Sequence, residues 1–344
     1  MSQTKQDDED RRKIQFTGGS TYIISLPKKW IALNRLKKGS YIRLREEADG
    51  LLTVVPPAAI IQEKSGKATV KMASNDNTAQ IIRKIISLYL AGYSMICVKA
   101  EPFSTKQRHE LKDVVRRLLV GTEIVLDTSN QVMLQVLLTY PELTILNTLR
   151  RMSIITKSMH RDAVLALKTK DVQLANEISL TDSEVDRFNL YVTRLLRSAI
   201  QNPRISKEIG LMNAKDCLSY IIVTRLIERT ADHAAAIAEN SLNLKNDLKP
   251  EVIEKIEQLS RLAIGMFDES MEALFRQDFS VAERVIEELQ KVMTIEKQAV
   301  IYSQGNPEDF AYLRLIIESL RRTAEYASDV AEIVLNLNAE SISV

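Results

Sequence analysis

The chain has 344 residues, of which 45% are apolar, 27% are charged and only 18 are glycine or proline. This length predicts two or three domains with hydrophobic cores, and the low glycine and proline content argues against a loop-rich all-β protein. Cys97 and Cys217 are too few and too far apart for a disulfide framework or a zinc site, so we expect reduced, buried thiols. Because no apolar run has the length of a membrane helix and the N-terminus lacks a signal-peptide pattern, a cytoplasmic protein without membrane insertion is expected.

Positive charge is concentrated near the N-terminus, although the formal net charge of the whole chain is only +2. Residues 1–10 contain four carboxylates and are predicted to form a disordered acidic tail. Residues 11–45 then carry ten basic side chains and no carboxylate. Such a segment on an otherwise balanced protein indicates a polyanionic partner.

The segment 11–57 predicts a small unit of short strands around one short helix. Strands are expected at 13–16, 21–26, 41–45 and 51–55, with a helix at 28–33 that begins after Pro27. A unit of this size buries too little apolar surface to be stable alone, so we expect it to pair with a second copy of itself.

Several strings of this segment carry a resemblance. Gly18-Gly19-Ser20, Ser25-Leu26-Pro27-Lys28 and Leu36-Lys37-Lys38-Gly39-Ser40 resemble the SpoVT/AbrB (MazE-like) swapped-hairpin DNA-binding domain. The resemblance implies that two chains interlock into one β-barrel that lays basic side chains on duplex DNA. The implied DNA-binding residues are Arg11, Arg12, Lys13, Lys28, Lys29, Lys37 and Lys38. Most of them would contact phosphates, and the two lysines after Pro27 would read the groove.

Residues 66–140 alternate strands with helices and predict a small α/β module. Strands are expected at 69–72, 94–98 and 122–126, and helices at 77–90 and 104–119. Neither glycine-rich phosphate-loop motif occurs at the turns between strands and helices. The module is therefore interpreted as structural or dimerising, with a small-ligand site as the alternative.

From residue 141 to 338 the pattern is almost wholly helical, and it repeats. Ala166-Leu167 recurs 107 residues later as Ala273-Leu274, and Arg229-Thr230-Ala231 recurs 93 residues later as Arg322-Thr323-Ala324. A longer loop in the first copy, at 202–204, explains the difference between the two offsets. The pattern predicts two tandem antiparallel three-helix bundles, at 141–245 and 249–338.

The first copy contains two pairs of carboxylates, each pair four residues apart on one helix: Asp182 with Asp186, and Glu228 with Asp232. Like charges at this spacing share a helix face and cost roughly 0.2–0.5 kcal/mol per pair. A cation such as iron, manganese, zinc or magnesium would neutralise them, because carboxylates are ligands that these ions accept. The alternative is that Arg187 and Arg229 neutralise the acids on an ordinary charged face.

The same four residues carry a second resemblance. Helical repeats with D-x-x-x-D on one helix and E-R-x-x-D-H-A on another resemble the PhoU family of phosphate-uptake regulators, which implies that the four carboxylates bind a metal cluster. The second copy departs from this pattern, since Met293, Arg321 and Glu325 stand where the first copy has Asp186, Glu228 and Asp232. Metal is therefore expected in the first bundle only.

These interpretations combine into a multidomain α+β fold with an AbrB-like barrel, a middle α/β module and PhoU-like bundles. The combination resembles the archaeal phosphate-uptake regulators that join these parts, and it implies a dimeric transcriptional regulator of phosphate uptake. The alternative is a PhoU-like adaptor that restrains a phosphate transporter or sensor kinase without binding DNA. His109, His160 and His233 lie outside catalytic motifs, so no enzyme is expected.

Overall fold

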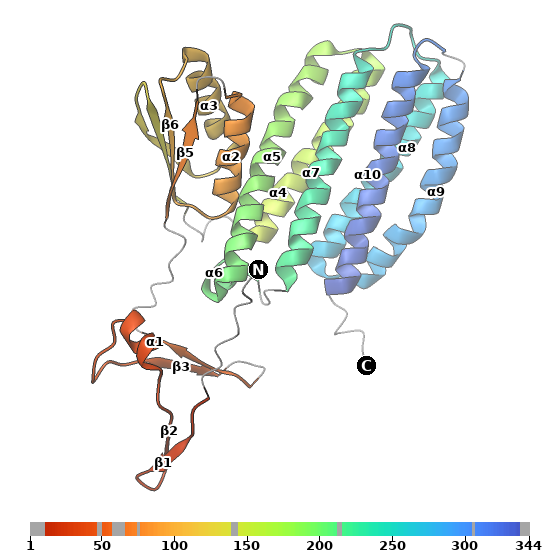
Figure 1. Cartoon of the computed structure of the whole chain (residues 1–344). Helices are drawn as coiled ribbons and strands as arrows, with labels where there is room; N and C mark the ends of the chain where they lie inside the picture. The colour runs from red at the N-terminus through yellow and green to blue at the C-terminus, as the bar shows by residue number, and fades with distance from the viewer. Residues whose placement is uncertain are drawn as a thin grey trace, which may run out of the picture. The chain divides into compact units, whose positions relative to one another are not determined.

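The computed structural model describes residues 11–46, 50–56, 66–73, 76–138, 144–211, 215–304 and 307–337 (Figure 1). The expected acidic tail, residues 1–10, lies outside the described residues. The chain divides into two compact units, Met1–Gln62 and Glu63–Val344, which are taken in turn.

The first unit consists of two β-hairpins and a short helix: β1 (Gln15–Thr17), β2 (Thr21–Ile23), α1 (Lys28–Leu33), β3 (Arg43–Glu46) and β4 (Leu52–Val55). Within the described residues, β1–β2 and β3–β4 are separate antiparallel sheets of two strands each. The first turn needs glycine, since Gly18 and Gly19 have φ angles of 64° and 79°, in the left-handed region. The predicted helix at 28–33 is confirmed.

Both strands of the first hairpin are shorter than predicted. The strand expected at 21–26 ends at Ile23, because β1 offers only three pairing positions and Gln15 is already opposite Ile23. Apolar side chains on the two hairpins stay in water, with Tyr22 74% and Leu44 60% exposed. One copy of this unit therefore buries almost no apolar surface.

The second unit begins with a four-stranded sheet and two helices: β5 (Lys67–Met72), α2 (Thr78–Leu90), β6 (Met95–Ala100), α3 (Thr105–Leu118), β7 (Thr122–Asp127) and β8 (Gln131–Val136). The strand order is β5-β6-β8-β7, with β5 parallel to β6 and the other pairs antiparallel. Asn77 caps α2, and Ser104 forms a capping box at the start of α3 as its sequence position predicts.

Strand β8 has no counterpart among the predicted elements. Its alternation of buried Val132, Leu134 and Val136 with half-buried glutamine and methionine is the pattern of a strand with one face on a core. Because β8 lies between β6 and β7, it completes the sheet and supplies three residues to the core of the α/β module.

The rest of the unit is helical: α4 (Ile145–Thr169), α5 (Val172–Gln201), α6 (Pro203–Glu208), α7 (Asp216–Ser241), α8 (Pro250–Arg276), α9 (Phe279–Ser303) and α10 (Phe310–Leu337). The long helices α4, α5 and α7 form the first copy, and α8, α9 and α10 form the second (Figure 1). The loop expected at 202–204 contains the short helix α6, which begins at Pro203, a residue favoured in a first helical turn.

The two copies share one hydrophobic core rather than two. Its buried residues come from all six long helices, and α10 packs against α7 as well as against α8 and α9. Lys170 and Gln277, at equivalent positions, end α4 and α8 in the left-handed conformation, each with a φ angle of 54°. In the described part of the chain, no helix is long and apolar enough to cross a membrane.

Candidate functional site

Three carboxylates meet where α5 packs along α7 in the first helical copy. One carboxylate oxygen from each of Asp186, Glu228 and Asp232 lies within 4.8 Å of the corresponding oxygens of the other two. Glu228 is only 6% exposed, whereas Asp232, one helical turn later, is exposed to solvent. The group therefore extends from the edge of the core to the surface.

Glu228 is the most constrained member of this carboxylate group. Its Oε1 accepts an ion-paired hydrogen bond from Arg225, three residues earlier on α7, and a longer one of 3.4 Å from Asn189 Nδ2. Its Oε2 is buried and has no hydrogen-bond partner among the described residues. An unpaired buried carboxylate oxygen is costly, so this atom is a ready ligand for a cation.

Asp182, the fourth expected ligand, lies near the group but outside it. Its carboxylate oxygens are not among those within 4.8 Å of one another, and its Oδ1 is buried without a hydrogen bond from any described residue. Burial first, and then the charges of Asp186 and Asp232, raise the pKa of Asp182 to about 7. The structure thus brings three of the four predicted residues together and leaves the fourth beside them.

Burial and mutual repulsion raise the pKa values of these acids above their ordinary range. The pKa of Glu228 is raised to about 7, mainly by burial and then by Asp232, against the opposing charge of Arg225. Burial also raises the pKa values of Asp186 and Asp232. A group of acids with raised pKa values at a packed boundary is typical of a functional site, although structural networks also perturb pKa values.

Of the two arginines expected to neutralise these acids, Arg229 acts on Asp232, and Arg225 and Arg117 act on the group as well. Arg225 pairs with Glu228, whereas Arg187 makes no ion pair with the acids within the described part of the chain. Arg229 acts only through its charge, which lowers the pKa of Asp232, and Arg117 on α3 does the same for Asp186. The sequence could have identified Arg225 as the partner of Glu228, because residues three positions apart are neighbours on a helix surface.

In the second copy the equivalent position holds a charge network closed by its own cation. Arg321 on α10 forms ion pairs with Glu296 on α9 at 3.3 Å, with Glu318 at 2.6 Å, and with Glu325. Arg321 is only 18% exposed, and the hydrogen bond that it donates lowers the pKa of Glu318. The guanidinium of Arg321 thus offsets the charge of these three glutamates.

The residues of the first copy fit a metal ion. Oxygen ligands bound to one cation at about 2.0–2.5 Å lie at most about 5 Å apart, so oxygens already within 4.8 Å of one another need little movement. The orphaned Oε2 of Glu228 supplies a buried ligand, and exposed Asp232 leaves a side open to solvent. Carboxylate ligands suit several ions, because iron, manganese, zinc and magnesium all accept them.

The seven predicted DNA-binding residues all lie on exposed positions of the first unit. Arg11, Arg12 and Lys13 precede β1, Lys28 and Lys29 begin α1, and Lys37 and Lys38 follow that helix. Because β1 and β2 are antiparallel, the residues before β1 and those between β2 and α1 leave the first hairpin at the same end. The three basic groups therefore belong to neighbouring segments of one small unit.

Two histidines of the helical unit, His160 and His233, pack against residues of neighbouring helices. His160 on α4 is fully enclosed, and its Nε2 lies 2.8 Å from the carbonyl oxygen of Thr230 on α7 and 3.3 Å from Oγ1 of Thr323 on α10. Since a carbonyl only accepts, Nε2 carries a proton, and burial lowers the pKa of His160 to about 4, which favours the neutral ring. His233 packs against the ring of Tyr326, its counterpart in the second copy, with 5.6 Å between the ring centroids.

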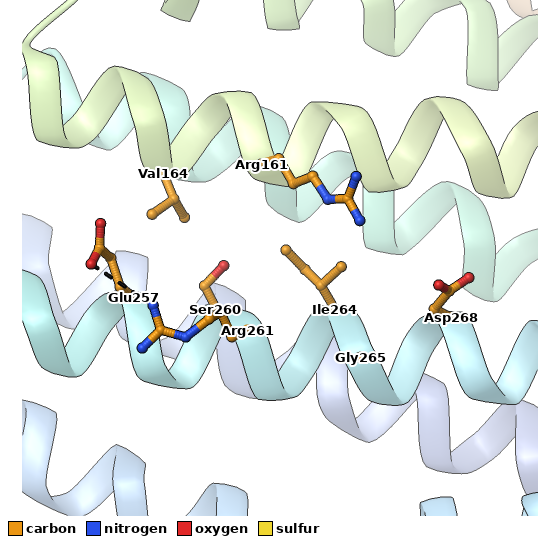
Figure 2. Close-up of a pocket in the computed structure, with 8 residues that line it drawn as sticks. All are labelled: Arg161, Val164, Glu257, Ser260, Arg261, Ile264, Gly265 and Asp268. Carbon is orange, nitrogen blue, oxygen red and sulfur yellow. Dashed lines mark ion pairs between the residues drawn. The ribbon is translucent and has the colours of Figure 1, made fainter.

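A concavity separate from the carboxylate group lies between α4 and α8 (Figure 2). It has a volume of about 340 Å³, and Arg161 and Val164 on α4 face Ser260, Ile264 and Asp268 on α8. Acids and bases alternate along its rim, where Glu257 pairs with Arg261 at 3.9 Å and Lys157 with Asp268 at 2.5 Å. This mixed and largely paired lining favours no particular ligand.

Comparison with known proteins identifies two parts of the chain. Residues 149–241 and 256–334 both match the family model described as the PhoU domain, and these segments begin 107 residues apart, like the internal repeat. Residues 15–62 match the family model described as antidote-toxin recognition MazE, bacterial antitoxin. The PhoU matches cover half of the chain.

Similar whole proteins match the helical part. The phosphate-specific transport system accessory protein PhoU homolog of Borreliella burgdorferi is 24% identical over 187 residues, covering 50% of this chain and 82% of that protein. The protein of the same name from Streptococcus pneumoniae is 27% identical over 183 residues, covering 49% and 80%. The crystal structure of the phosphate transport system regulatory protein PhoU from Streptococcus pneumoniae superposes with a TM-score of 0.50 at 19% identity, covering 57% of this chain and 94% of that one, which shows a shared fold.

Proposed function

The chain belongs to the PhoU family, and from this membership we propose that it is a regulatory accessory protein of a phosphate transport system. The observation that carries the proposal is the paired PhoU match over half of the chain, supported by relatives named for phosphate-specific transport that match it over most of their length. In this proposal the protein acts in the cytoplasm on a transporter or on a signalling protein that controls one.

The carboxylate group of the first copy is the part through which we propose that the protein responds. Asp186, Glu228 and Asp232 would hold a cation, and Asp182 would shift its protonation when the ion binds. A bound cation would offset the charge of these acids and would have a coordination position open at a solvent-facing edge, which suits an anionic group on a partner. Arg225 keeps Glu228 oriented, because it already pairs with one carboxylate oxygen and leaves the other free.

Phosphate uptake in the source organism tests this role. Deleting the gene is expected to raise the rate of radiolabelled phosphate uptake under phosphate-replete conditions, and the intact gene should restore it. A gene carrying Asp232→Asn should restore uptake control less well than one carrying Glu325→Gln, the change at the corresponding position of the second copy. Unchanged uptake in the deletion strain would argue against a transport-related role.

A second function, DNA binding by a dimer, is favoured by three observations on the first unit. The seven basic residues before β1, at the start of α1 and after that helix are exposed, and residues 15–62 match the MazE antitoxin model. The apolar side chains left in water on both hairpins, including Tyr22 and Leu44, would be buried if two chains interlocked into one barrel. In this proposal the helical unit senses phosphate status and the dimer acts as a transcriptional regulator.

The salt dependence of DNA binding by the full chain tests this second function. If the basic residues neutralise phosphates, affinity for duplex DNA should fall steeply as salt rises, because condensed counterions are released on binding. Lys28→Ala with Lys29→Ala should weaken binding to all sequences, while Lys99→Ala with Lys106→Ala, exposed lysines of the second unit, should not. If the chain binds no duplex DNA even at low salt, the proposal that remains is an accessory protein that acts as an adaptor without binding DNA.

Dimerisation has a separate readout. The interlocked barrel predicts a dimer by analytical ultracentrifugation, and Tyr22→Ser with Leu44→Ser should convert it to a monomer because the buried apolar seam would be lost. A variant with the exposed side chains Leu146→Ser and Ile154→Ser on α4 is the matched control. A monomeric wild-type chain would contradict the barrel.

A further inference from the structure

The α/β module carries a groove between its edge strand and its first helix. Strand β5 lies at the end of the sheet and pairs, within the described residues, only with β6. A groove of about 660 Å³ runs between β5 and α2, and its lining includes Thr69, Val70, Lys71, Arg83, Lys84 and Leu88. Both elements belong to one module and lie side by side (Figure 1).

The open edge of β5 offers a regular row of main-chain groups. In any strand, alternate residues direct their N–H and C=O groups to opposite sides, so about half of those in Lys67–Met72 face away from β6. Such an edge pairs readily with another extended chain. An extended peptide that lies in a groove between an edge strand and a helix is bound by main-chain hydrogen bonds, and its side chains are selected by the groove.

The charges of this groove select for acidic side chains. Lys71 on β5 and Arg83 and Lys84 on α2 are exposed, and the groove lining contains no carboxylate. None of these three cations makes an ion pair within the described part of the chain. Lysine on an edge strand also deters unwanted strand pairing, but that role does not explain two further cations on the facing helix.

The floor of the groove is apolar. Val70 is only 6% exposed and directs its side chain toward the helices, and Leu88 on the last turn of α2 is half-buried. The side chains of a bound strand would therefore alternate between the two faces of the sheet. One set would lie between Val70 and the side chains of Arg83 and Lys84, and the other set would lie beside Thr69 and Lys71.

We propose that the β5–α2 groove binds an extended acidic segment of a partner protein, about six residues long, as an added strand of the sheet. A second copy of this chain is a poorer occupant, because pairing through β5 would gather the lysines of both strands and two sets of Arg83 and Lys84 along one seam. Single-stranded nucleic acid matches the charge but not the main-chain pattern of the edge. The inference is independent of the proposed metal centre and of DNA binding.

Synthetic peptides added to the full-length protein test the proposal. The probe is a fluorescent pool of six-residue peptides with glutamate at alternate positions and valine, isoleucine or threonine between. We expect saturable binding by fluorescence anisotropy, with protection of the β5 amides from hydrogen exchange. A matched pool with lysine in place of glutamate should bind at least about tenfold more weakly, because the groove is cationic.

Two further comparisons separate strand addition from general charge attraction. Peptides with N-methyl groups at alternate positions keep their charge but lose main-chain donors, so one of the two registers should bind at least about tenfold more weakly. Arg83→Glu with Lys84→Glu should abolish binding, whereas Lys106→Glu with Arg116→Glu, exposed cations on α3 that change the net charge equally, should leave it within about twofold.

Three results would overturn the proposal. These are no binding of the acidic pool at millimolar concentration, equal losses in the α2 and α3 variants, and binding unaffected by N-methylation in either register. A single-stranded oligonucleotide that displaces the peptides and protects β5 more strongly than they do would instead assign the groove to nucleic acid.

Discussion

Glu228 and Arg321 occupy equivalent positions in the two helical copies and carry opposite charges. The residue three positions earlier is also exchanged, since Arg225 precedes Glu228 and Glu318 precedes Arg321, so each copy has an internal ion pair of reversed polarity. In the first copy the acids outnumber the facing base and one carboxylate oxygen remains unpaired. In the second, the guanidinium is shared by three glutamates.

Metal content is expected to depend on the first copy only. Asp186→Asn combined with Glu228→Gln should lower metal affinity at least about tenfold, because two of three oxygen ligands lose their charge. Elemental analysis of protein purified without chelator measures this. Glu296→Gln combined with Glu318→Gln is the control in the second copy and should leave metal content unchanged. Equal metal loss in both variants would contradict a site in the first copy.

Removing the guanidinium of the second copy should destabilise the fold. Arg321→Met leaves Glu296, Glu318 and Glu325 facing one another, and we expect the free energy of unfolding to fall by about 2–3 kcal/mol. Arg322→Met removes the same charge from a side chain that is 46% exposed and should cost less than about 1 kcal/mol. Chemical denaturation of both variants is the measurement, and similar losses would mean that Arg321 is an ordinary surface residue.

The metal-free protein should lose stability as the pH rises through the carboxylate window. Asp182 and Glu228 have pKa values of about 7 in the folded chain, above their ordinary values of 3.8 and 4.5, so the folded state holds protons that the unfolded state releases. The destabilisation caused by ionising these two carboxylates in the folded chain is absent below about pH 4 and complete above about pH 7. Asp182→Asn should therefore raise the free energy of unfolding by about 2 kcal/mol near pH 8 and have little effect near pH 4. Denaturation with chelator at both pH values tests this, and a pH-independent effect would contradict it.

His160 should act in the opposite direction at acid pH. Burial lowers its pKa from 6.5 to about 4, so the unfolded chain takes up a proton between these values while the folded chain does not. Its contribution to stability is full above about pH 6.5 and is lost as the pH falls to about 4. His160→Gln retains a donor for the carbonyl of Thr230 without titrating, so the acid limb of the stability curve should flatten. An unchanged acid limb would mean that other groups cause it.

Arg194 is expected to hold the α/β module against α5. Its guanidinium donates hydrogen bonds to the carbonyl oxygens of Tyr89 and Gly92, at the end of α2, and lies 4.8 Å from the centre of the Tyr89 ring. Arg194→Met should lower the free energy of unfolding by about 2–3 kcal/mol, because the buried carbonyl of Tyr89 and the half-buried carbonyl of Gly92 lose a charged donor. Hydrogen exchange should then increase in α2 and β5 but not in α9. Uniform exchange across the unit would indicate global destabilisation instead.

Periodicity and capping residues predicted most of the helices. The helices expected at 28–33, 77–90 and 104–119 match α1, α2 and α3, and Asn77 and Ser104 cap the last two because capping depends on a local residue choice. Strand β8 was missed although its residues alternate as those of a strand do, and its place between β6 and β7 depends on contacts far apart in the sequence. The end of β2 was likewise fixed by the length of its partner rather than by its own sequence.

The candidate site was predicted in composition but not in geometry. Spacing of four identified Asp186, Glu228 and Asp232, yet it could not show that Asp182 stays outside their group, because that depends on how α5 rotates against α7. The roles of Asn189 and Arg117 also depend on packing between elements far apart in the sequence. The charge swap at Arg321 was visible from the repeat alone.

The common core of the two copies bears on how such a molecule could arise. A half-length chain with only α4, α5 and α7 would bare the helix faces that α8 and α10 now cover, and two such chains could bury them against each other in a symmetric dimer. In a symmetric dimer both halves have the same sequence, whereas in one fused polypeptide the two sequences can change independently. The first copy could then keep a carboxylate group whose neutralisation needs a bound cation, while the second copy acquired a cation of its own, Arg321.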